Sequence, residues 1–115
     1  MTPDSGPALV LVATPLGNLG DLSPRAVEAL AGADVVACED TRRTLALLSA
    51  AGVTGKRLVA VHAHNEAARA GELARLVDEG RRVVLVSDAG MPVVSDPGER
   101  VVAAAVAAGH RVTVV

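Results

Sequence analysis

The sequence predicts an α/β fold, an open and mostly parallel five-stranded sheet with helices on both faces. Short apolar runs rich in valine recur along the chain, with room for one helix between each pair. The runs are continuous rather than alternating, which is typical of strands buried on both faces. The segments between them carry helix caps and apolar residues at helical spacing. Such alternation of strand and helix favours βαβ units.

The predicted strands are the five runs of β-branched and other small apolar residues. They cover Ala8–Ala13, Val35–Cys38, Leu58–Val61, Val83–Val86 and Val112–Val115. Residues 1–7 precede the first strand, and we expect them to form a flexible lead. Residues 8–115 then make one domain, because 115 residues are enough for one small core and no more.

Four helices are predicted between the strands. Ser23 is the expected N-cap of the first, with Pro24 at its first position and Val27 and Leu30 as its apolar stripe. Leu45 and Leu48 have helical spacing in the second. The other two share an i, i+3, i+4 pattern that ends at a glycine: Leu73, Leu76 and Val77 before Gly80, and Val102, Ala105 and Val106 before Gly109.

The composition excludes several classes of function. There is no Phe, Tyr or Trp, so no aromatic side chain can stack on a nucleic-acid base. The net charge of −2 argues against a general nucleic-acid coat, although a local arginine patch is compatible with it. A single cysteine cannot form an internal disulfide, and neither a signal peptide nor a membrane span is evident. We therefore expect a cytoplasmic protein without membrane contact.

In open parallel sheets, ligands bind beyond the carboxyl ends of the strands. This rule selects the four loops that follow strands, Thr14–Leu22, Glu39–Thr41, His62–Asn65 and Ser87–Pro97. In the first, glycines allow close approach of backbone to a ligand, but no dinucleotide or P-loop motif is present. The first loop is also longer than the usual connection of about 2–6 residues.

The second loop combines carboxylates and arginines. Asp40 or Thr41 is expected to cap the second helix, while Glu39 and Asp40 are also candidates for catalysis. Arg42 and Arg43 fall in the first helical turn, where the helix dipole disfavours cations. Their placement suggests an anionic partner, either a carboxylate of this protein or a phosphate.

The third loop carries an H-x-H pattern. His62 and His64 point to one side of an extended chain, so a metal-dependent hydrolase is one alternative. Three or four ligands are usual for a metal, and His110 lies at the opposite end of the last strand. We predict no metal, and we expect Asn65 to cap the third helix, with Glu66 favourable in its first turn.

The fourth loop divides into two parts. Asp96 with Pro97 and Glu99 has the form of a helix cap. The preceding SDAGMP is not explained by capping. Asp88 disfavours a phosphate there and suits a ligand with cationic character.

Four segments in order, TPLGNLGDLSPRAVEAL, ACEDTRRT, VHAHNE and VSDAGMPVVSDPG, resemble the ribosomal RNA branch of the tetrapyrrole (corrin/porphyrin) methylase superfamily. The resemblance covers residues 8–115 and implies a Rossmann-like amino-terminal domain of a two-domain methyltransferase, with the carboxyl-terminal domain absent. It implies S-adenosylmethionine as cofactor and a cytidine ribose 2′-hydroxyl of 16S ribosomal RNA as methyl acceptor. We expect this half alone to fold but to be inactive. A homodimer through the last strand is a further expectation.

The resemblance also assigns residues. The cofactor-binding candidates are Pro15, Leu16, Gly17, Ser87, Asp88, Ala89, Gly90 and Pro92. The substrate-side or catalytic candidates are Asn18, Glu39, Asp40, Arg42, His64 and Asn65. As general base we rank His64 first, then Asp40 and Glu39, while the absent domain is also a possible source. Met91 stands where the family usually has Thr, and Ala63 stands where it usually has an acidic residue. A tetrapyrrole methylase and a fragment that only binds or dimerises are the remaining alternatives.

Overall fold

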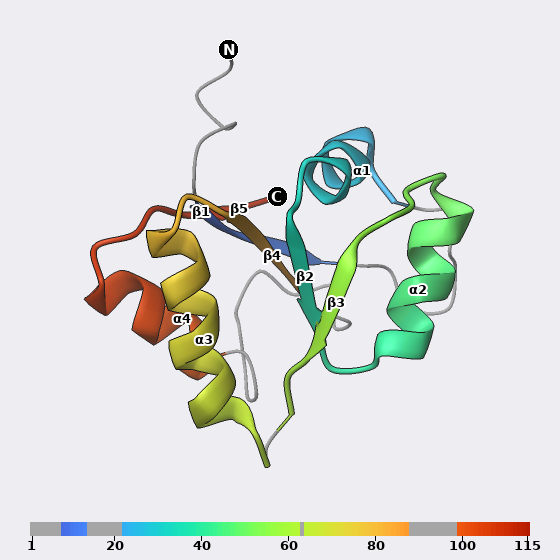
Figure 1. The fold of residues 1–115 in the computed structure, drawn as a ribbon. Coiled ribbons are helices and arrows are strands. Elements are labelled where there is room, and N and C mark those ends of the chain that lie inside the picture. Colours follow the sequence, from blue (N-terminus) through green and yellow to red (C-terminus); the bar gives the residue numbers. More distant parts are fainter. Residues whose placement is uncertain (1–7, 14–21, 63, 88–98) are drawn as a thin grey trace.

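The computed structural model confirms the predicted α/β class. It describes residues 8–13, 22–62, 64–87 and 99–115. The strands are β1 (Ala8–Ala13), β2 (Val35–Cys38), β3 (Arg57–Ala60), β4 (Arg82–Ser87) and β5 (Val112–Val114), and they alternate with helices α1 (Pro24–Ala31), α2 (Thr41–Ala50), α3 (Glu66–Asp78) and α4 (Glu99–Ala107) (Figure 1). The predicted bounds of β1 and β2 are confirmed, whereas β3 begins and ends one residue earlier than predicted.

All strand pairs are parallel, and the strand order is β3-β2-β4-β1-β5. This order was not predicted. β4 lies at the centre, because Ala8–Ala13 pair with Arg82–Ser87 on one side and residues of β2 pair with β4 on the other. The carboxyl ends of β1 and β4 are in register, with Ala13 opposite Ser87.

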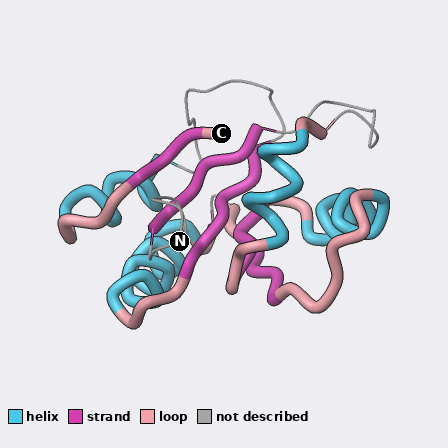
Figure 2. Tube along the Cα trace, turned by 90° about the horizontal axis from the view of Figure 1, so that it is seen from above, coloured by secondary structure: helices cyan, strands magenta, loops and turns pink. Residues whose placement is uncertain are grey.

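Helices cover both faces of the sheet (Figure 2). Alternate residues along each central strand belong to two separate apolar clusters. One cluster contains Val10, Val36 and Val84 together with residues of α1 and α2. The other contains Leu9 and Val83 together with residues of α3 and α4. The continuous apolar runs therefore reflect burial on both faces, as predicted.

Two predicted helix faces need correction. Leu45 and Val106, which the spacing placed in the core, are 56% and 60% exposed. The buried stripe of α2 is Thr44, Leu47 and Leu48 instead. In the part of α4 whose side chains the structure describes, residues 101–107, Val101 is buried, at 1% exposed. Leu48 of α2 and Ala105 of α4 are buried as predicted, so only Leu45 and Val106 depart from the expected stripes. Sequence spacing alone does not fix the exact edge of a helix face.

Caps and turns mostly follow the predicted chemistry. Ser23 Oγ accepts from the Ala26 N–H at 3.1 Å, which caps α1 as expected. Gly80 and Gly109 adopt positive φ angles just after α3 and α4. Lys56, the only lysine of the chain, donates from Nζ to the Ala31 carbonyl and, at 2.9 Å, to the Ala33 carbonyl. It thereby joins the α2–β3 connection to the end of α1.

None of the helices in the described part of the chain is both long enough and apolar enough to cross a bilayer.

Candidate functional site

The carboxyl edge of the sheet brings together loops that are far apart in the sequence. β2 and β3 are neighbours, and their pairing continues one residue past the end of β3, because the Val61 N–H donates to the carbonyl of Cys38, the last residue of β2, at 2.8 Å. Glu39 and Asp40 therefore leave the sheet next to the loop that begins at His62. Of the predicted substrate-side residues, the structure gathers Glu39, Asp40 and Arg42 after β2, and His64 and Asn65 after β3.

The loop after β2 separates the roles of its two carboxylates. Asp40 is the N-cap of α2, and its Oδ1 accepts from the Arg43 N–H at 3.1 Å. The open choice between Asp40 and Thr41 as cap is thus settled in favour of Asp40. Glu39 is exposed and forms no ion pair with any residue that the structure describes. Among the described contacts, Glu39 is therefore the carboxylate of this loop without a structural role.

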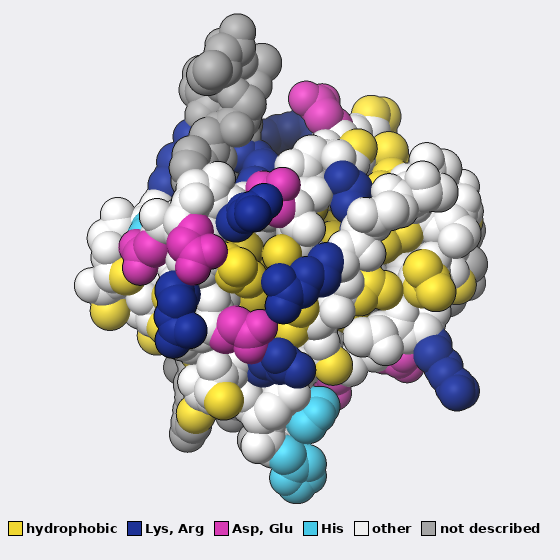
Figure 3. All heavy atoms as spheres, in the orientation of Figure 1, with side chains coloured by type: hydrophobic (Ala, Val, Ile, Leu, Met, Phe, Trp, Pro, Cys, Tyr) yellow, Lys and Arg dark blue, Asp and Glu magenta, His cyan; other side chains and the backbone are white. Residues whose placement is uncertain are grey.

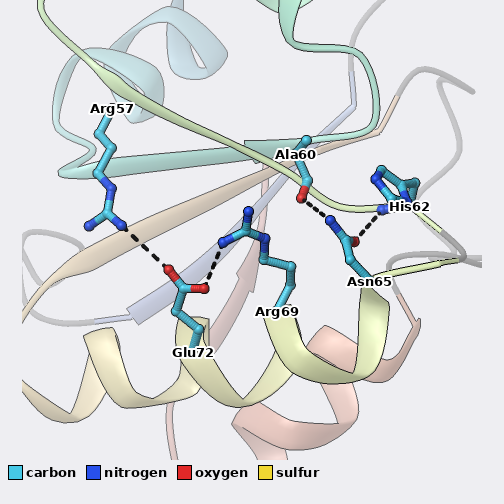
Figure 4. A network of polar contacts seen from close by, with 6 residues as sticks. All are labelled: Arg57, Ala60, His62, Asn65, Arg69 and Glu72. Atoms are coloured by element: carbon cyan, nitrogen blue, oxygen red, sulfur yellow. Dashed lines mark hydrogen bonds and ion pairs between the residues drawn. The ribbon is translucent and has the colours of Figure 1, made fainter.

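Asn65 binds the end of β3 instead of capping α3. Its Oδ1 accepts from the His62 N–H at 2.9 Å, and its Nδ2 donates to the Ala60 carbonyl at 3.0 Å (Figure 4). Asn65 occupies the N-cap position, but its side chain makes no capping bond, so the predicted capping role is wrong. The amide holds the chain in a tight turn from the strand end to the helix, which determines where His62 lies.

The two histidines of the H-x-H pattern lie side by side. The centroids of the His62 and His64 rings are 5.9 Å apart, and the rings meet edge to face. His64 is exposed, whereas His62 is half-buried, and its buried Nδ1 has no hydrogen-bond partner among the described residues. A buried polar atom without a partner is unfavourable and marks a position where a ligand group could bind. Sequence reasoning considered His62 only as a metal ligand.

Metal binding receives no support from the described residues, among which no group of three His, Cys, Asp or Glu side chains is arranged to hold an ion. The third histidine, His110, precedes β5 at the opposite edge of the sheet. Its Nε2 lies 2.8 Å from Asp78 Oδ1 at the end of α3. His110 thus has a structural partner far from the H-x-H pair.

Glu66 is a second residue that sequence reasoning undervalued. Its side chain, in the first turn of α3, is only 5% exposed. The helix N-terminus favours a carboxylate at this position, as the sequence indicated. What the sequence does not reveal is this burial.

Most predicted cofactor-binding residues lie outside the described part of the chain. These are Pro15, Leu16, Gly17, Asp88, Ala89, Gly90 and Pro92. Outside the described part there also lie the substrate-side candidate Asn18, the family departures Ala63 and Met91, the cap candidate Asp96 and residues 1–7. Ser87 is the last residue of β4, the central strand. The loops that contain the cofactor candidates therefore start from two adjacent strand ends, Ala13 and Ser87.

A parallel α/β domain with carboxylate, imidazole and amide groups at the carboxyl edge of its sheet belongs to the Rossmann-like class of ligand-binding domains. Residues 8–115 match the family model described as Tetrapyrrole (Corrin/Porphyrin) Methylases. The chain belongs to this methyltransferase family, as the sequence motifs indicated.

Several curated relatives carry the name Ribosomal RNA small subunit methyltransferase I. The protein of Mesorhizobium japonicum is 51% identical over 106 residues, which are 92% of this chain and 36% of the relative. That of Micromonospora olivasterospora is 53% identical over 100 residues, 87% of this chain and 32% of the relative. That of Escherichia coli O157:H7 is 46% identical over 104 residues, 90% and 36% respectively. The chain spans about a third of the length of these relatives.

Proposed function

We propose that this chain is the amino-terminal domain of a two-domain methyltransferase that uses S-adenosylmethionine to methylate a cytidine ribose 2′-hydroxyl of 16S ribosomal RNA in the cytoplasm. The main support is the identity of about one half to relatives named Ribosomal RNA small subunit methyltransferase I. The polar side chains at the carboxyl edge are consistent with this function.

The described residues fit the proposed cofactor. Glu39 presents a carboxylate at the edge, which suits a ligand with cationic character such as a sulfonium. The buried Nδ1 of His62 has no hydrogen-bond partner within the described ranges, and a nucleoside hydroxyl could supply one. When bound, S-adenosylmethionine supplies the methyl group on its sulfonium. The loops after β1 and β4 would form the remainder of this pocket.

The residues of this domain would orient the acceptor hydroxyl and remove its proton. His64 is exposed at the edge and remains our first candidate for the general base, with Glu39 second. Asp40 becomes the weakest of the three, because its carboxylate already caps α2. A positioned base contributes about 10²–10⁴-fold to the rate, and alignment of the reacting groups contributes further.

Methyl transfer by a longer protein that contains this chain would test the proposal. Small ribosomal subunits and precorrin-type tetrapyrroles are offered separately with labelled S-adenosylmethionine. We expect label in the ribosomal RNA, and an about 10²–10⁴-fold lower rate for His64→Ala. His110→Ala, at the opposite edge, serves as the matched control and should retain the rate. Label in the tetrapyrrole alone would overturn the RNA assignment in favour of the other substrate class of the family.

Calorimetry compares the affinity of the longer protein for S-adenosylmethionine with the affinity of this chain. We expect S-adenosylmethionine to bind the longer protein and to bind the 115-residue chain weakly. Absence of binding to both would contradict the methyltransferase proposal itself.

A further inference from the structure

Two arginines at the carboxyl edge lack a partner in the described structure. Arg42 and Arg43 occupy the first turn of α2, and both side chains are exposed. Neither guanidinium forms an ion pair with a residue that the structure describes. By contrast, Arg57 and Arg69 both pair with Glu72, at 3.4 and 2.7 Å, where β3 meets α3 (Figure 4).

The nearby carboxylates do not neutralise the two arginines. Glu39 is three and four residues before them, yet it lies within ion-pair distance of neither. Asp40 uses its Oδ1 for the backbone N–H of Arg43, not for a guanidinium. The first turn of α2 contains no acidic residue. The sequence suggested either a carboxylate of this protein or a phosphate as the anionic partner. No carboxylate of the described residues fills this role.

The positions of these arginines are unfavourable for the isolated helix. The N-terminus of a helix carries partial positive charge, so two cations in the first turn are repelled by it. An anionic ligand would relieve this repulsion, and an arginine fork matches the geometry of phosphate oxygens.

Because Arg42 and Arg43 are consecutive, they suit contact with two neighbouring phosphates better than contact with one phosphate. Consecutive helical residues point about 100° apart, since a helix has about 3.6 residues per turn, and they do not face each other. Arg42 and Arg43 therefore reach outward in different directions from one helix end. Basic and acidic side chains are interspersed on the face of the molecule seen in Figure 3, which shows no broad basic surface.

We propose that Arg42 and Arg43 form a contact for neighbouring phosphates of the RNA backbone, next to the carboxyl edge of the sheet. This inference rests on the proposed function and specifies which residues of this domain hold the RNA. The absence of Phe, Tyr and Trp is consistent with recognition mainly through phosphates.

The salt dependence of RNA binding tests this proposal. Fluorescence anisotropy of a short labelled single-stranded RNA is measured with the 115-residue chain at a series of salt concentrations. Each lost phosphate contact lowers the slope of log K against log salt by about 0.7. Arg42→Gln and Arg43→Gln should each show this decrease, which corresponds to about fivefold weaker binding at ~0.1 M salt. The double variant should lose about 25-fold.

Arg81→Gln is the matched control, because Arg81 is also exposed but lies just before β4, at the opposite edge. It removes the same charge and should leave the slope unchanged. Thermal unfolding of each variant accompanies the titrations. Replacing a cation in the first turn of α2 should leave the melting temperature equal or higher, so weaker binding cannot arise from unfolding.

Each outcome is decisive. Equal slopes for the α2 variants and the control would overturn the phosphate contact and leave the methyltransferase proposal standing. A reduced slope without methyl transfer to RNA by the longer protein would support the contact and overturn the proposed function. No binding of RNA by the wild-type chain at low salt would overturn the contact.

Discussion

Replacement of Asn65 by alanine removes two hydrogen bonds that hold the end of β3. The Oδ1 bond to the His62 N–H is 2.9 Å and the Nδ2 bond to the Ala60 carbonyl is 3.0 Å. Each bond contributes about 0.5–1.5 kcal/mol net. Both are part-buried, and β3 is an edge strand, so water can replace part of the loss. We therefore expect Asn65→Ala to lower the free energy of unfolding by about 1–2 kcal/mol.

Urea denaturation measures this loss as a lower midpoint with an unchanged slope. Hydrogen exchange then locates it at the His62 amide, which should lose its protection in Asn65→Ala. Asn65→Asp retains the acceptor oxygen and should keep this amide protected. Asn65→Ser can cap α3 but is too short to reach β3, so stability should partly recover while the amide remains unprotected.

A His62 amide that exchanges as slowly in Asn65→Ala as in the wild type would refute this reasoning. A loss of stability below about 0.5 kcal/mol, the lower limit for one bond, would have the same meaning.

Substitutions at three further positions test local features of the fold by the same denaturation assay. Asp40→Ala should cost about 1 kcal/mol because it removes the cap of α2, whereas Asp40→Asn keeps an acceptor and should cost much less; equal losses would contradict the capping role. Gly80→Ala should cost about 1–2 kcal/mol, because φ is +91° there. Gly71→Ala, in the interior of α3 with open space at its Cβ, should instead gain about 0.5–1 kcal/mol. Opposite signs are expected, and equal effects would show that backbone conformation is not the cause.

The sequence predicts the elements well because the two-sided burial of a parallel sheet leaves a strong signal. Valine-rich runs and the glycines after helices have one dominant physical explanation each. The helix faces were harder: in α2, Leu45 competes with the stripe of Thr44, Leu47 and Leu48, and only the shape of the sheet decides. Strand order likewise depends on long-range packing, which a local sequence pattern does not reveal.

The sequence predicted which loops form the candidate site more accurately than it predicted the role of each residue in them. The carboxyl-edge rule places Glu39 and His64 in one region from the sequence alone. The roles of Asp40 and Asn65 depend on which backbone group each side chain reaches. Both residues stand before a helix, but only Asp40 caps one, since the strand end competes successfully for the Asn65 amide. His62 gains interest only when the burial of its Nδ1 is known.

The central position of β4 has a consequence for how the chain acquires its fold. β1 and β2 do not pair with each other, and both join the sheet through β4. Until residues 82–87 have been synthesised, the growing chain therefore has two valine-rich strands with open edges and nothing to bridge them. Contacts so distant in sequence slow folding, and open edges promote association. A nascent chain of this protein should therefore be most prone to association before its fourth strand emerges from the ribosome.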